Sequence, residues 1–133
     1  MIDAKLKKKL DEIVSKYVRL KYADKNGNCA CYTCGKIKPW KEMQCGHLIK
    51  RNHTCTRWLL DNLRVQCAGC NVFGDGKFDE FAVKLEKEGI KLADLVKLKH
   101  SICKIDNKWI KESIEAYSQD VKILENGLEN DQV

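Results

Sequence analysis

The feature that most constrains the fold of this chain is a pair of Cys-x-x-Cys motifs, Cys31/Cys34 and Cys67/Cys70. Two residues between the cysteines let both sulfurs of a pair reach one ion at ~2.3 Å, and four thiolates suit tetrahedral Zn²⁺. The sequence therefore predicts one structural zinc site that pins both ends of the intervening segment. A closed site of this kind contributes to folding and performs no chemistry itself.

The remaining cysteines and the chain's N-terminal sequence indicate the compartment. The chain begins with MIDAKLKKKL, which lacks the apolar run of a signal peptide, and no stretch approaches the ~18 apolar residues of a membrane span. We therefore expect a cytoplasmic protein with reduced thiols and no membrane partner. Cys29 could replace Cys31 only with a longer knuckle. We interpret the other three as small buried apolar side chains: Cys45, Cys55 and Cys103.

Hydrophobic periodicity predicts an α+β fold. Apolar residues recur at helical spacing in four segments: residues 2–22, 78–88, 92–100 and 107–124. Short strands are expected at residues 43–49 and 62–66, and Gly127 is expected just beyond the end of the last helix. These elements predict a treble-clef core with a four-cysteine zinc site, flanked by N-terminal and C-terminal helices. The expected parts of one compact domain are an N-terminal helix (1–28), a zinc-bound core (29–80) and a C-terminal helical extension (81–133).

The charge is unevenly distributed along the 133 residues, which carry a net charge of +6. Residues 26–64 contain seven Lys and Arg but two Asp and Glu, whereas residues 65–133 contain ten and thirteen. The basic stretch surrounds His47, where affinity for phosphate would be useful. Nucleic acid is therefore the expected partner, although solvated lysines on exposed faces would give a similar count.

Three polar residues between or beside the knuckles predict a hydrolytic site. Hydrolysis of a phosphodiester needs a base to activate water and a cation beside the scissile phosphate. His47 suits the base, and Asn71, directly after the last zinc cysteine, offers an amide oxygen to Mg²⁺ or Mn²⁺. Asn62 precedes the expected second strand, where its amide could fix the loop that carries His47.

These motifs together resemble a known family. The runs CYTCGK, CGHLIKR and DNLRVQCAGCN resemble the phage NinG (Rap) recombination endonucleases, within the zinc-containing HNH (ββα-metal) nucleases. The layout is also similar to the endonuclease VII resolvases. The resemblance implies a structure-selective DNA endonuclease that cuts branched intermediates such as Holliday junctions and D-loops. By position it makes His47 the general base, Asn71 the metal ligand and Asn62 the loop-fixing residue.

One position departs from the family pattern. Many of these nucleases have Asp or His immediately before the base as a second metal ligand, whereas this chain has Gly46. Asn71 could hold the cation with water and substrate oxygens, or another carboxylate could substitute. Asp75 lies four residues after Asn71 and is a weak candidate, because two flanking glycines favour a solvated turn.

The expected contacts with DNA are phosphate contacts from basic residues, which suit recognition of shape over sequence: Lys50, Arg51, Arg57, Arg64 and Lys77. Trp40 and Trp58 could stack on unpaired bases, although packing in the core is the more common fate of tryptophan. A homodimer is expected, because symmetric cutting of a four-way junction needs two active sites. The alternatives are a non-catalytic zinc module that binds nucleic acid and a sequence-specific HNH nuclease.

Overall fold

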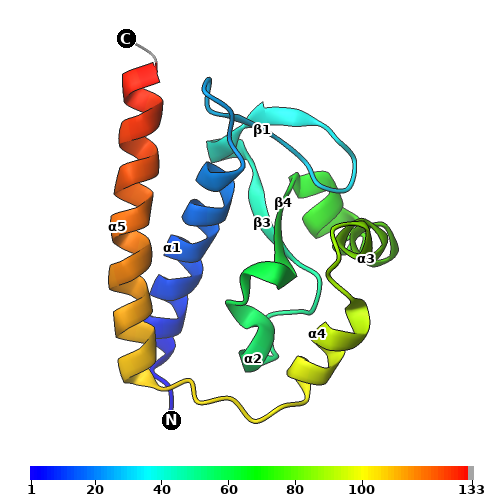
Figure 1. Ribbon diagram of the computed structural model, residues 1–133, viewed down its shortest axis with the longest axis vertical. Helices are drawn as coiled ribbons and strands as arrows, with labels where there is room; N and C mark the ends of the chain where they lie inside the picture. Colours follow the sequence, from blue (N-terminus) through cyan, green and yellow to red (C-terminus); the bar gives the residue numbers. More distant parts are fainter. Residues whose placement is uncertain (132–133) are drawn as a thin grey trace.

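The computed structural model describes residues 1–131 of the chain (Figure 1). Its α-helices are α1 (Ala4–Lys21), α2 (Thr54–Arg57), α3 (Phe78–Lys87), α4 (Leu92–Lys99) and α5 (Asn107–Asp131). Its strands are β1 (Asn28–Ala30), β2 (Ile37–Pro39), β3 (Gln44–His47) and β4 (Leu63–Gln66). Shorter helical turns are η1 (Trp40–Glu42), η2 (Leu60–Asn62) and the π-helical η3 (Gly69–Phe73). The chain is thus a mixed helix and sheet protein, as predicted.

The two long helices, α1 and α5, run side by side and parallel along one edge of the molecule (Figure 1). At one end the Asp3 backbone N–H donates to Asn107 Oδ1 at 2.9 Å, and toward the other end Lys16 pairs with Glu125 at 2.5 Å. Asp3 also caps α1 by accepting from the N–H of Lys5 at 2.7 Å. Because α1 and α5 pack on each other, the apolar faces predicted from their helical spacing are buried within one chain.

The first hydrophobic core lies between α1, α5 and the β3–β4 hairpin. On α1, Leu10, Val14 and Val18 recur every four residues and are at most 2% exposed. Ile110 of α5 is fully buried in the same cluster, and Val65 contributes from β4. The α1 helix is therefore covered by the hairpin on one side and by α5 on the other.

Two antiparallel hairpins carry the zinc motifs. In the β3–β4 hairpin Cys45 lies opposite Val65 and His47 opposite Leu63. The β1–β2 hairpin, which the sequence did not reveal, encloses the first Cys-x-x-Cys, and the Tyr32 N–H donates to the Val65 carbonyl at 2.8 Å. That bond places the first Cys-x-x-Cys motif against β4. The second motif begins directly after the end of β4.

A second, smaller core lies beneath the loop that follows β3. Leu48 and Ile49 of this loop pack on Phe81 and Leu85 of α3 and on Leu95 of α4. Among the described residues, no helix has the length and apolar content needed to cross a membrane.

Two expectations from the sequence are wrong. The last helix does not end before Gly127 but continues through it to Asp131. A glycine inside a helix costs only about 1 kcal/mol relative to alanine, so it does not by itself end the helix. Residues 132–133 lie outside the described part of the chain.

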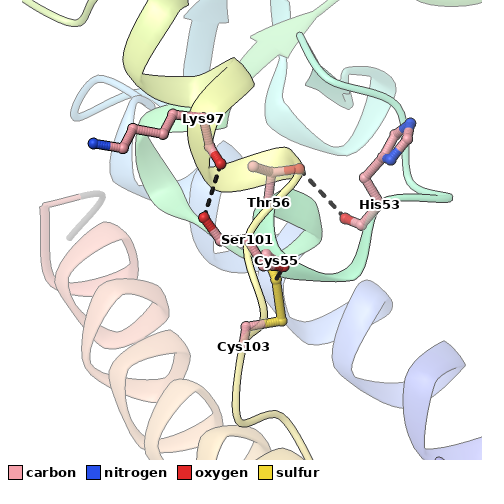
Figure 2. Close-up of a disulfide and its surroundings, with 6 residues drawn as sticks. All are labelled: His53, Cys55, Thr56, Lys97, Ser101 and Cys103. Atoms are coloured by element: carbon pink, nitrogen blue, oxygen red, sulfur yellow. Dashed lines mark hydrogen bonds between the residues drawn. A yellow bond between two sulfur atoms is a disulfide. The ribbon is translucent and has the colours of Figure 1, made fainter.

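The second correction concerns the cysteines, because Cys55 and Cys103 are not small buried apolar side chains. They form a disulfide that joins α2 to the linker between α4 and α5 (Figure 2). The linker is also ordered by Ser101, whose Oγ donates to the Lys97 carbonyl at 2.8 Å. The pairing links residues 48 positions apart and ties the linker beside the loop that carries His47.

Candidate metal centre and adjoining cleft

Four cysteine sulfurs converge where the two knuckles meet. The Sγ atoms of Cys31, Cys34, Cys67 and Cys70 all lie within 4.8 Å of one another, and those of Cys34 and Cys67 are 3.7 Å apart. Sulfurs at ~2.3 Å from a tetrahedral zinc ion lie ~3.8 Å from one another. The cluster therefore has the donor type, number and spacing to bind one zinc ion.

Two thiols of this cluster have pKa values shifted in opposite directions. Burial raises the pKa of Cys31, but hydrogen bonds from the Thr33 hydroxyl and from backbone N–H groups outweigh it and lower the pKa to about 6. Burial, together with hydrogen bonds to the three other thiols, raises the pKa of Cys70 to about 12. Four thiolates repel one another at this distance, and a bound divalent cation removes that repulsion.

His47 ends β3, and its ring is oriented by a backbone carbonyl. The Nε2 atom lies 2.9 Å from the carbonyl oxygen of Arg57. A ring nitrogen facing a carbonyl carries the proton, so the lone pair is on Nδ1. Burial lowers the pKa of His47 from its ordinary value, more than the Arg57 carbonyl raises it. The ring is therefore neutral near pH 7, the form that can accept a proton.

Asn62 holds the loop between β3 and β4 in place. Its side chain is fully buried, with Oδ1 accepting from the Ile49 N–H at 2.7 Å. Its Nδ2 donates to the carbonyls of Ile49 at 2.9 Å and Thr56 at 3.0 Å. Removing the amide would leave buried backbone groups without partners, so this residue fixes the segment that supplies the Arg57 carbonyl to His47.

Asn71 lies on η3, immediately after the zinc cysteine Cys70. Its Nδ2 donates to Gln44 Oε1 at 2.7 Å, which fixes the amide and leaves Oδ1 to accept or to coordinate. An amide oxygen is a hard ligand that suits Mg²⁺, a cation that keeps several waters and needs few protein ligands. The η3 turn thus joins a structural cysteine to a side chain that could hold a second metal.

Gly46 supplies no second ligand, and its surroundings explain the glycine. A Cβ atom at this position would lie 2.0 Å from Oε1 and 2.6 Å from Cδ of Gln66. The Gln66 side chain is fully buried, and its Nε2 donates to Thr33 Oγ1 at 3.1 Å and to the Gly76 carbonyl at 2.9 Å. Gln66 therefore occupies the space that a side chain at position 46 would need.

His47 and Asn71 line the same cleft, which has a volume of about 680 Å³. Arg19, Lys50 and Arg51 also line it, against the single carboxylate of Asp11. The side chains of Lys50 and Arg51 are 55% and 62% exposed. The cleft is thus basic and brings together two of the three residues that the sequence indicated for catalysis.

Two of the expected phosphate contacts are engaged within the chain. Arg64 is 5% exposed and pairs with Glu88 at 3.1 Å, with Tyr32 beside them. Arg57 pairs with Asp11 at 2.5 Å through a side chain that is 19% exposed. Each of these two guanidinium groups therefore already has an acidic partner within the chain.

The loop after η3 presents Asp75 and Lys77 to solvent. The Asp75 side chain is 98% exposed and lies 3.5 Å from Lys50 Nζ, which places it in an ion pair with the cleft lysine. Its carboxylate therefore has a cationic partner already. Lys77 is exposed with φ of 52°, a left-handed conformation that is uncommon outside glycine.

Asp11 of α1 was not identified from the sequence, yet it organises the site. Its carboxylate accepts from Arg57 Nε at 3.0 Å and from Trp58 Nε1 at 2.9 Å. These bonds hold the residue whose carbonyl orients His47. The only sequence signal for this role was an acidic residue at the edge of the apolar face of α1. That signal does not identify Arg57, 46 residues away, as its partner.

The fold and site define a small mixed α and β protein with a four-cysteine metal-binding centre beside a basic cleft. The model of the family described as bacteriophage lambda NinG protein matches residues 3–129. This chain belongs to the NinG family. No curated protein and no solved structure matches it.

Proposed function

We propose that this NinG-family protein is a structure-selective DNA endonuclease of the HNH (ββα-metal) type that cuts branched recombination intermediates, such as Holliday junctions and D-loops. The observation that carries the proposal is the cleft in which a neutral, carbonyl-oriented His47 lies with Asn71 among three basic side chains. The succession of β3, β4 and η3, together with the four clustered cysteines, supports a treble-clef core of this class.

In the proposed reaction His47 acts as general base. Because Nε2 is bonded to the Arg57 carbonyl, Nδ1 accepts the proton of the attacking water. Lys50 and Arg51 attract and position the DNA backbone through its phosphates. Asn71 Oδ1 would hold Mg²⁺ or Mn²⁺, which would neutralise charge at the scissile phosphate.

The test is cleavage of four-way, D-loop, fork and duplex DNA by the wild type, by His47→Ala and by Asn71→Ala. His47→Ala should retain DNA binding and lose turnover, because a base acts in the transition state more than in binding. Asn71→Ala should raise the Mg²⁺ requirement or abolish cutting. Lys91→Ala, at the residue just before α4 and not among those that line the cleft, serves as the control. Wild-type cutting by His47→Ala would refute the mechanism.

Two alternatives remain as outcomes of the same assay. Binding without cleavage by any variant would favour a non-catalytic zinc module for nucleic acid. Cutting of one duplex sequence in preference to branched DNA would favour a sequence-specific HNH nuclease.

Symmetric cutting of a junction further leads us to propose a homodimer. We expect the dimer to form through the helices; because α1 and α5 pack on each other within the chain, that contact would use the faces of these helices that remain exposed. Light scattering should give twice the 15.3 kDa chain mass, and a strict monomer that makes paired cuts would exclude the dimer.

A further inference from the structure

The two residues after Asn71 form an exposed apolar tip on η3. Phe73 is 86% exposed and Val72 is 58% exposed, and Val72 also lines the cleft. We refer to Val72 and Phe73 as the apolar tip. The two tryptophans considered for base stacking lie elsewhere: Trp58 is 5% exposed in the core, and Trp40 is half-buried and covered by Arg19.

The apolar tip is held by the metal centre and is not a loose loop. The zinc cysteine Cys70 belongs to the same π-helical turn, and the Gly74 N–H donates to the Gly69 carbonyl at 2.7 Å. The Gly76 N–H donates to the Cys70 carbonyl at 2.9 Å, which closes the turn behind Phe73. The Lys50 ion pair with Asp75 ties the same turn to the loop after His47. Phe73 is therefore presented to solvent from a fixed backbone.

The charges around the apolar tip indicate what it contacts. Arg19, Lys50 and Arg51 line the cleft on one side, and Lys77 follows in the next turn. The carboxylate between them, Asp75, is exposed and is paired with Lys50 at 3.5 Å. A ligand that covers this region must offer anionic groups to the cleft and an apolar, flat surface to a phenyl ring. Nucleic acid combines phosphates with base faces in this way, and aromatic side chains stack on bases that are free of their neighbours.

We propose that Phe73 stacks on an unpaired base of the bound DNA, with Val72 packing against the adjoining sugar, and that this contact selects branched DNA over duplex. In continuous duplex every base is stacked and paired, so Phe73 has no partner without disrupting a step. At a branch point or a single-stranded gap a base face is available. This inference rests on the proposed function, since it requires that DNA occupies the cleft.

The experiment compares the wild type with Phe73→Ala, Phe73→Trp and the control Ile123→Ala, which removes a side chain that is 68% exposed on α5. Fluorescence anisotropy in Ca²⁺ measures binding to a duplex and to a four-way junction of equal arm length that carries unpaired bases at the branch. A second junction carries 2-aminopurine at an unpaired position beside the branch, whose fluorescence reports stacking. Zinc content and circular dichroism confirm that each variant is folded.

Phe73→Ala should weaken junction binding by on the order of 5- to 100-fold and change duplex binding by less than about 2-fold. Phe73→Trp should restore both junction binding and 2-aminopurine quenching, and Ile123→Ala should behave as the wild type. Equal losses on junction and duplex, or no loss on either, would overturn the stacking contact while DNA binding stood. A wild type that bound neither DNA would instead overturn the proposed function, and this inference with it.

Discussion

Gly46→Ala is a small substitution for which the structure predicts a large effect. The added Cβ would lie 2.0 Å from Gln66 Oε1 and 2.9 Å from its Cγ, so the glutamine side chain must move. Gln66 is fully buried, and moving it breaks the hydrogen bonds from Nε2 to Thr33 and to the Gly76 carbonyl. An overpacked core costs ~1–3 kcal/mol and each lost bond ~0.5–1.5 kcal/mol. We expect a loss of about 2–6 kcal/mol in the free energy of unfolding.

The assay is urea denaturation followed by tryptophan fluorescence, with zinc present throughout. Gly127→Ala is the matched control, because nothing lies within 4 Å of its added methyl group and a helical alanine should stabilise by up to ~1 kcal/mol. A double-mutant cycle with Gln66→Ala isolates the clash, since the obstructing side chain is then absent. The reasoning fails if Gly46→Ala is as stable as the wild type, or if its penalty is the same in the Gln66→Ala background.

Three further predictions concern the metal, the disulfide and pH. Metal analysis should find one zinc ion per chain, and chelation or Cys67→Ser should unfold the core, since structural zinc contributes ~10–16 kcal/mol in small modules; folded protein without zinc would contradict this. Reduction, or Cys103→Ser in oxidised protein, should lower the free energy of unfolding by about 4 kcal/mol for a separation of 48 residues, measured by denaturation with and without reductant; identical curves would contradict it. Because burial lowers the pKa of His47 below its ordinary 6.5, the fall of the cleavage rate toward acid should be centred below pH 6.5. The stability linked to that lowered pKa is likewise present above pH 6.5 and lost as pH falls; an acid limb centred above 6.5 would exclude His47 as the base.

The parts of this structure that follow from local patterns could be predicted from the sequence. The four cysteines lie close together as predicted, each Cys-x-x-Cys motif fixing the geometry of its own pair, and the helices follow from spacing within a few turns. The paired residues that shape the site are far apart in the chain. The Asp11–Arg57 ion pair and the Cys55–Cys103 disulfide form only where the folded chain brings these residues together. Residue types alone do not specify that path.

The same reason applies to the basic residues. Arg64 alternates with apolar neighbours on β4, and its partner Glu88 lies just past the end of α3, so only the folded path shows that its charge is used internally. Composition correctly placed positive charge around His47. It could not distinguish Lys50 and Arg51, which face the cleft, from arginines that stabilise the fold.

The parallel arrangement of α1 and α5 has a consequence for synthesis of the chain. Parallel neighbours need a long connection, and here nearly the whole protein separates the first helix from the last. The face of α1 that α5 covers is made first and covered last, after on the order of ten seconds at ~5–20 residues per second. During that interval the nascent chain exposes an apolar helix beside unmetallated thiols. Its yield in the cell should therefore depend on chaperone capacity and zinc supply during translation more than on the stability of the finished fold.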